Sequence, residues 1–95
     1  MANETRKRAD LWASLVRIKK QKQWIKAIER LGLEAIPSKG SHYTARRPGY
    51  ELQDMNGLVV TIQYHVRKDV NEEIFKTLMK KGFKEDDIWK ALDML

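Results

Sequence analysis

The segment Leu33–Tyr64, which reads LEAIPSKGSHYTARRPGYELQDMNGLVVTIQY, carries the strongest indication of the fold class. It contains three strand-like runs, at residues 33–37, 42–47 and 58–64. Gly40 lies in the turn after the first run, and Asn56-Gly57 is a strong turn signal before the third. Because no helical stretch separates the runs, the strands are expected to pair as an antiparallel meander.

Alternation along the runs predicts which face of the sheet each side chain occupies. In the second run, Tyr43 and Ala45 are expected to face inward, and the outward set is His42, Thr44 and Arg46. In the third run the predicted inward set is Leu58, Val60, Ile62 and Tyr64. Its predicted outward set is Val59, Thr61, Gln63 and His65.

Amphipathic helices flank this segment on both sides. Residues 4–21 and Trp24–Leu31 are predicted helices, and one long bent helix is the alternative because no Pro or Gly marks the break. Asp69 with Glu72 resembles a capping box that opens a helix through Lys81. A last helix is expected to begin around Glu85–Asp87 and to bury residues as far as Leu95. The tryptophans are predicted core anchors: Trp12, Trp24 and Trp89.

The fold class predicted by this order is α+β. A three-stranded antiparallel sheet carries helices on one face in the order α-β-β-β-α, as in double-stranded-RNA-binding-like folds, with an extra N-terminal helix and a C-terminal helix. We expect one domain over residues 1–95, with a basic helical extension at 1–22 and a core at 23–95.

The positive charge is concentrated in one half of the chain. Residues 1–48 hold 12 Lys and Arg against 4 Asp and Glu, a balance of +8, whereas residues 49–95 hold 7 against 9, a balance of −2. Nucleic acid is the commonest partner of such an excess, although a solvated helix face gives the same count. The N-terminal basic helix could bind phosphates, dock its apolar face, or be a solvated surface.

Composition also excludes several classes of protein. Without cysteine the chain has no disulfide and no thiolate zinc site, and two histidines do not make a usual metal site, so we expect no metal or cofactor. Met1–Glu4 does not begin an apolar signal segment, and apolar clusters such as Leu58–Val60 are too short for a bilayer. We therefore expect a soluble, cytoplasmic protein without a membrane partner.

Over about residues 24–92 the chain resembles the HicA-type mRNA-interferase toxins of bacterial type II toxin–antitoxin systems. The residues that carry the resemblance are Leu31-Gly32-Leu33, Lys39-Gly40-Ser41-His42, Arg47-Pro48, Val60-Thr61-Ile62, His65, Lys68-Asp69-Val70, Ile74 and Leu78–Phe83. The chain departs from the family pattern at Tyr43, Gln63 and Glu73, and its first twenty or so residues have no counterpart in a minimal toxin.

The resemblance implies a small metal-independent ribonuclease with His42 as the catalytic histidine, and a HicB-type antitoxin that covers the site. A histidine suits this role because its proton affinity lies near physiological pH. Ser41 and His42 are neighbours on a strand and point to opposite faces, so the attacking group is expected to be the RNA 2′-hydroxyl. The predicted RNA-binding residues are Lys39, Gly40, Ser41, Thr44, Arg46, Arg47, His65, Arg67 and Lys68.

Two alternatives belong to different functional classes. The same fold could bind RNA through its basic half without cleaving it, and His42 would then be an exposed polar residue without a catalytic role. A protein–protein adaptor that uses the N-terminal amphipathic helix is the third possibility. The sequence gives no oligomeric state.

Overall fold

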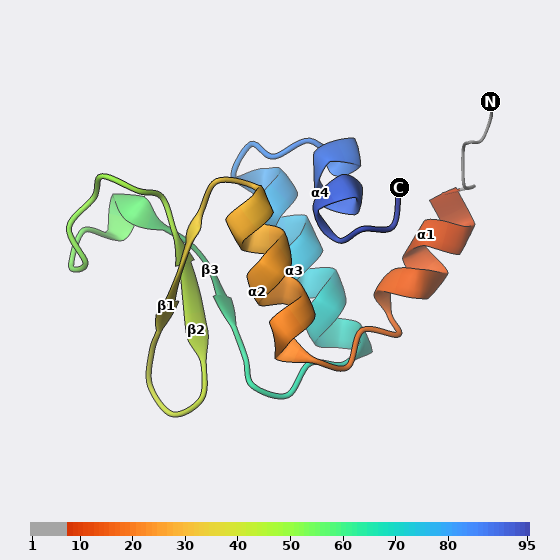
Figure 1. Cartoon of the computed structure of the whole chain (residues 1–95), viewed down its shortest axis with the longest axis horizontal. Helices are drawn as coiled ribbons and strands as arrows, with labels where there is room; N and C mark the ends of the chain where they lie inside the picture. Colours follow the sequence, from red (N-terminus) through yellow and green to blue (C-terminus); the bar gives the residue numbers. More distant parts are fainter. Residues whose placement is uncertain (1–7) are drawn as a thin grey trace.

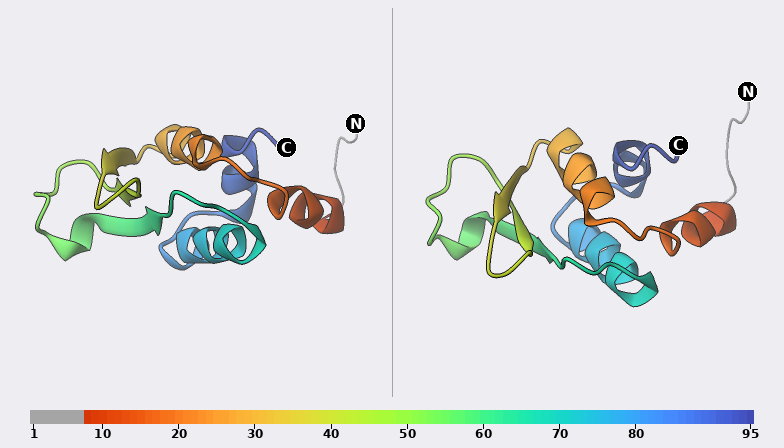
Figure 2. Two further views of the ribbon diagram at one scale, coloured as in Figure 1. Left: turned by 90° about the horizontal axis from the view of Figure 1, so that it is seen from below. Right: turned by 60° about the horizontal axis from the view of Figure 1, so that its bottom comes forward.

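The computed structural model describes residues 8–95 and contains four α-helices and three strands within them (Figure 1). In chain order the elements are α1 (Arg8–Leu15), α2 (Gln21–Arg30), β1 (Glu34–Pro37), β2 (Tyr43–Arg46), the short 3-10 helix η1 (Met55–Gly57), β3 (Leu58–Ile62), α3 (Lys68–Lys80) and α4 (Glu85–Ala91). The sheet lies at one end of an elongated molecule, α1 lies at the other end, and α2, α3 and α4 lie between them (Figures 1 and 2).

The three strands form an antiparallel sheet in the order β1-β2-β3, as expected for a meander. Ala45 pairs with Ala35 on one side and with Val60 on the other, so these three residues share the inner face. Helix α2 contacts all three strands and α3 contacts β3. The predicted α+β class, with helices on one face of the sheet, is confirmed.

A β-bulge alters the alternation that the sequence predicts. Ala45 pairs with Val60 but the next residue, Arg46, pairs with Leu58, which leaves Val59 as an extra residue in β3. Val59 and Arg46 are both buried, whereas both are expected to face outward from a regular strand. Beyond the bulge the prediction also fails at Tyr64, which follows the end of β3 and is exposed rather than inward.

The N-terminal helix packs on the rest of the protein. It ends at Leu15, earlier than the predicted residue 21, and a linker separates it from α2, so one long bent helix is excluded. Residues 4–7 of the predicted helix lie outside the described residues. Leu11 and Leu15 are buried, and the Trp12 ring packs against Phe75 at 4.9 Å. The apolar face of α1 is therefore docked within the chain.

The tryptophans occupy the core as predicted. Trp24 and Trp89 are fully buried, and Trp12 is half-buried with its ring edge-on to Trp89 at 5.5 Å. Phe75 of α3 completes the aromatic group, 4.4 Å from the Trp89 ring. Aromatic pairs in tilted and edge-on arrangements add to the apolar area that they bury. This group joins α1, α3 and α4.

The side chain of Asn71 is the buried polar centre of the fold. Its Oδ1 accepts a hydrogen bond from the Trp24 indole N–H at 2.9 Å. Its Nδ2 donates to the carbonyl oxygens of Leu15 and Ile18, at 3.0 and 2.9 Å. One amide therefore connects α3, α2 and the α1–α2 linker, and a satisfied buried network of this kind favours a single arrangement.

The later helices differ from the prediction at their ends. Helix α3 starts at Lys68, after the extended residue Arg67, so Asp69 lies in the first turn and is not the cap. Helix α4 begins at Glu85 as expected but ends at Ala91 rather than near Leu95. None of the helices within residues 8–95 combines the length and apolar character needed to cross a bilayer.

Candidate nucleic-acid interface

The turn between β1 and β2 presents His42 to solvent. The His42 N–H donates to the Lys39 carbonyl at 3.1 Å, and the His42 carbonyl accepts from the Ser38 N–H at 2.8 Å. Gly40 has a φ of +61°, a conformation that is open to glycine and costs most other residues about 1–2 kcal/mol. The turn is thus closed on both sides of Gly40, and His42 is held where β2 begins.

A backbone contact with the residues after β3 orients the His42 ring. The Tyr64 N–H donates to His42 Nδ1 over 3.4 Å. Since a backbone N–H can only donate, Nδ1 presents its lone pair, and in the neutral ring the proton is on Nε2. This distance lies beyond the usual range for such bonds, so the contact orients the ring at low energetic cost and can be opened.

The start of α2 joins the β1–β2 turn to the end of β3. Gln21 Nε2 donates to the Ser41 carbonyl at 2.8 Å and to the Ile62 carbonyl at 3.2 Å. Next to it, Lys20 forms an isolated antiparallel bridge with His65. Figure 1 shows the β1–β2 turn, the β3–α3 connection and the α1–α2 linker along one edge of the molecule. The two histidines therefore lie on segments that are fastened together.

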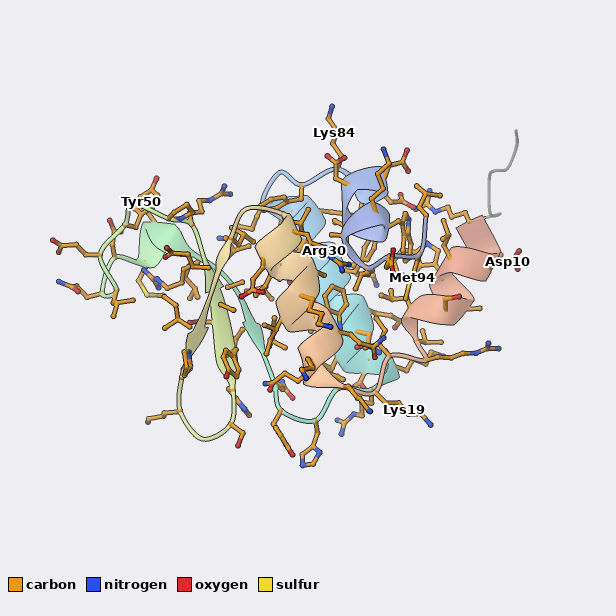
Figure 3. All side chains as sticks on the ribbon, viewed as in Figure 1. Asp10, Lys19, Arg30, Tyr50, Lys84 and Met94 are labelled. Atoms are coloured by element: carbon orange, nitrogen blue, oxygen red, sulfur yellow. The ribbon has the colours of Figure 1, made fainter. Side chains whose placement is uncertain are left out.

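A cationic hollow of about 370 Å³ lies beside this junction. It is lined by Lys19, Lys20, Gln21, Lys22, Tyr64 and His65. The charged residues among these are all lysines, and none is acidic. The N-terminus of α2, which is the positive end of its helix dipole, lies at the same place. Lys19 is seen on the α1–α2 linker, far from Tyr50 on the β2–β3 connection (Figure 3). Such a hollow attracts anions.

Tyr64 and His65 form an aromatic pair at the rim of the hollow. Their ring centroids are 4.8 Å apart and the rings are nearly perpendicular, at 77°. Tyr64 keeps 53% of its surface exposed, so its ring is accessible to a ligand. The pair adds a flat, partly apolar surface to the cationic hollow.

The predicted phosphate contact Arg46 is directed elsewhere. Arg46 is only 6% exposed, and its Nη2 donates to the carbonyl oxygens of Glu51 and Asp54. These carbonyls belong to the β2–β3 connection, which folds around the guanidinium group. The prediction that Arg46 lies on the exposed face beside His42 is therefore wrong, because the β2–β3 connection folds over this side chain and buries it.

Two more of the predicted basic residues, Arg47 and Arg67, bond to other parts of the protein. Arg47 Nη2 donates to the Lys81 carbonyl at 2.8 Å, and its guanidinium carbon lies 5.7 Å from the centre of the Phe83 ring. Arg67 pairs with Asp69 at 2.8 Å. This hydrogen bond and the opposite charge hold the pKa of Asp69 below its usual value and raise the pKa of Arg67.

The remaining predicted residues divide between the turn and the sheet. Lys39, Gly40 and Ser41 lie on the exposed turn with His42. Thr44 is half-buried, and its hydroxyl donates to the Ile36 carbonyl at 3.4 Å. Lys68 is exposed where α3 starts, and it does not line the hollow. Of the predicted set, the structure brings the turn residues and His65 to the same edge of the molecule.

Sequence reasoning missed the lysines of the hollow and Tyr64. Lys19 and Lys20 were expected at the end of the first helix and Lys22 between the two helices, whereas the first two lie on the linker that precedes α2 and Lys22 lies in its first turn. The sequence shows two short clusters, Lys19-Lys20-x-Lys22 and Tyr64-His65, but it does not show that they meet. In the structure the Lys20–His65 bridge brings the two segments together.

Residues 8–95 contain no cluster of three or more His, Asp or Glu side chains able to hold a metal ion. Comparison of the chain with protein-family models, with curated proteins and with solved structures finds no match. The resemblance to HicA-type toxins therefore rests on the residues that carry it in the sequence.

Proposed function

We propose that this protein is a HicA-like endoribonuclease that cleaves mRNA without a metal ion. The observation that supports the proposal is the placement of exposed His42 beside a cationic hollow, on segments joined by Gln21 and by the Lys20–His65 bridge. A phosphate near His42 would have an imidazole within reach and lysines to offset its charge. An enzyme with this substrate would act in the cytoplasm.

In the proposed reaction the attacking group comes from the RNA. The 2′-oxygen bonds to phosphorus and the bond from phosphorus to the 5′-oxygen breaks, which gives a 2′,3′-cyclic phosphate and a 5′-hydroxyl. When the substrate displaces the long contact with the Tyr64 N–H, His42 Nδ1 accepts the proton of the 2′-hydroxyl. The imidazolium then returns a proton to the departing 5′-oxygen. One general acid–base group accelerates a reaction about 10²- to 10⁴-fold, so we expect a slow enzyme.

The experiment is cleavage of end-labelled RNA in the presence of EDTA by the wild-type protein and by His42→Ala. We expect the wild type to produce fragments that end in a cyclic phosphate, and His42→Ala to produce none while unfolding at the same denaturant concentration. A matched RNA with 2′-O-methyl groups should stay intact with both proteins. Cleavage by His42→Ala at the wild-type rate would show that His42 is not catalytic. Cleavage of the methylated strand would show that the 2′-hydroxyl is not the attacking group.

A second candidate function is RNA binding without cleavage, and the contact at His42 Nδ1 favours it. While the Tyr64 N–H occupies Nδ1, the ring offers only the Nε2 hydrogen, which can donate to a phosphate oxygen but cannot accept a proton. In the same assay this function predicts that RNA is retarded on a native gel and keeps its full length. The affinity would fall with salt in proportion to the phosphates bound.

The resemblance also leads us to propose a HicB-like antitoxin as the protein partner. Such a partner would cover His42 and compete with RNA for the hollow. We expect co-expression with the product of an adjacent small gene to give a complex that does not cleave RNA. A complex that still cleaves RNA at the rate of the free protein would contradict this placement of the partner.

A further inference from the structure

The hollow beside His42 has the two components that are needed to hold one unpaired nucleotide. Lys19, Lys20 and Lys22 supply positive charge on one side, and the exposed Tyr64 ring supplies a flat surface on the other. Its volume of about 370 Å³ lies within the range of pockets that hold small organic ligands, well above what a lone phosphate needs. Charge and aromatic surface together are typical of sites for single-stranded nucleic acid.

The Tyr64 ring is held in place although it is exposed. Its ring lies edge-on to the ring of His65, 4.8 Å away. His65 in turn is bridged to Lys20. A ring fixed in this way loses little conformational entropy when a base stacks on it, which favours binding.

The hollow and His42 form one continuous surface. Tyr64 contacts His42 through its backbone N–H and is also one of the residues that line the hollow, so it belongs to both. A nucleotide whose base stacks on Tyr64 would therefore have one neighbouring phosphate near His42 and the other near the lysines. Stacking needs an unpaired base, because the faces of the bases in a duplex are covered by their neighbours.

We infer that the hollow binds a nucleotide of single-stranded RNA, with its base on Tyr64 and a backbone phosphate on Lys19 and Lys22. The inference rests on the proposed function for the statement that the ligand is RNA. It adds that this RNA is single-stranded, and it names the residues that bind it. Tyr64 is a binding residue here and takes no part in proton transfer.

The test measures binding by fluorescence anisotropy with a labelled 2′-O-methyl single strand, which cannot be cleaved, so that binding and cleavage are separate results. Tyr64→Ala should weaken binding about 5- to 150-fold, the range expected from the loss of one base–aromatic stack. Tyr64→Phe keeps the ring and should stay within about twofold of the wild type.

A strand of equal length without bases separates stacking from charge. The wild type should bind this abasic strand as weakly as Tyr64→Ala binds the normal strand, and Tyr64→Ala should cause no further loss on it. The lysines should act differently: Lys19→Ala with Lys22→Ala should flatten the slope of log affinity against log salt by about 0.7 for each phosphate contact removed. The matched control, Lys76→Ala with Lys80→Ala on α3, should leave the slope unchanged.

Three results would overturn the inference. Equal affinity of Tyr64→Ala and the wild type for the normal strand would exclude stacking, and tighter binding of the corresponding duplex would exclude an unpaired ligand. An unchanged salt slope in the variant of Lys19 and Lys22 would exclude these lysines. If the wild type binds as expected but never shortens RNA, the proposed nuclease fails and the inference stands.

Discussion

The Asn71 side chain donates a hydrogen bond to the Ile18 carbonyl over 2.9 Å in the buried core, directly before Lys19 and Lys20. The linker between α1 and α2 has no regular structure of its own, so this bond and the equivalent one to Leu15 fix its course. The cationic hollow therefore depends on an amide buried on the opposite side of the linker. This connects the stability of the fold with the geometry of the candidate site.

Asn71→Ala should be among the most destabilising single substitutions in the chain. It would leave the Trp24 indole N–H and the Ile18 carbonyl without a hydrogen-bond partner in the core, and the Leu15 carbonyl would keep only the bond from the Ile18 N–H. Each unsatisfied buried group costs about 1–3 kcal/mol, so we expect the free energy of unfolding to fall by about 2–5 kcal/mol. Urea unfolding followed by tryptophan fluorescence measures it. Asn56→Ala, at an exposed position, is the matched control and should change it by less than about 0.5 kcal/mol.

Arg46→Leu should lower stability without changing the contacts to RNA. The Arg46 guanidinium bonds the carbonyls of Glu51 and Asp54, and leucine cannot replace these bonds, so a loss of about 1–3 kcal/mol is expected. The salt dependence of RNA binding should match that of the wild type. A shallower salt slope for Arg46→Leu would restore this residue as a phosphate contact.

The misplacement of Arg46 shows where sequence reasoning stops. The three strands, their order and their antiparallel pairing follow from local alternation and turn residues, and Tyr43 and Ala45 face the core as predicted. The bulge at Val59 depends on how the β2–β3 connection folds around Arg46, a tertiary effect that alternation does not contain.

The hollow could not be predicted for a related reason. Its lysines and its aromatic pair are more than forty residues apart in the sequence, and they meet through Asn71 and the Lys20–His65 bridge. No Pro or Gly marks the end of α1, so the sequence predicts a helix as far as residue 21 and does not show that it ends at Leu15. In contrast, the exposed position of His42 followed from the turn that precedes it.

Gly40→Ala should strain the turn that carries His42. Gly40 has a φ of +61°, and a Cβ atom there would meet no atom within 4 Å, so the cost is one of backbone conformation alone. We expect a loss of about 1–2 kcal/mol in unfolding free energy. Gly40→Asn should cost less, because asparagine tolerates this conformation, and the order Gly, Asn, Ala in urea midpoints checks the prediction. Equal midpoints for Asn and Ala would contradict it.

Protonation of Asp69 should remove a small contribution to stability in acid. The hydrogen bond from Arg67 lowers the pKa of Asp69 in the folded protein, so the contribution is complete above the pKa of the unfolded chain and is lost as the pH falls through the lowered value. NMR titration of the Asp69 carboxyl carbon should give a midpoint below that of the same group in Arg67→Ala. Coincident midpoints would mean that the pair does not persist in solution.

Gln21→Ala should weaken RNA binding while leaving the fold almost unchanged. The Gln21 amide holds the Ser41 and Ile62 carbonyls together, and both bonds are accessible enough for water to replace them, so we expect a loss of less than about 1 kcal/mol in stability. Without this brace the turn that carries His42 is free to move relative to the hollow, and binding must first restore their alignment. An alignment cost of about 1 kcal/mol corresponds to a roughly fivefold loss of affinity for the 2′-O-methyl strand.

Gln23→Ala is the matched control for this brace, since Gln23 is exposed on the same helix and does not line the hollow. It should bind RNA as the wild type does. Amide hydrogen exchange adds a direct measurement: the N–H of His42 should exchange faster in Gln21→Ala and at the wild-type rate in Gln23→Ala. If both variants bind equally well and exchange equally slowly, the turn keeps its position without Gln21, and the alignment of His42 with the hollow has to come from the Tyr64 contact alone.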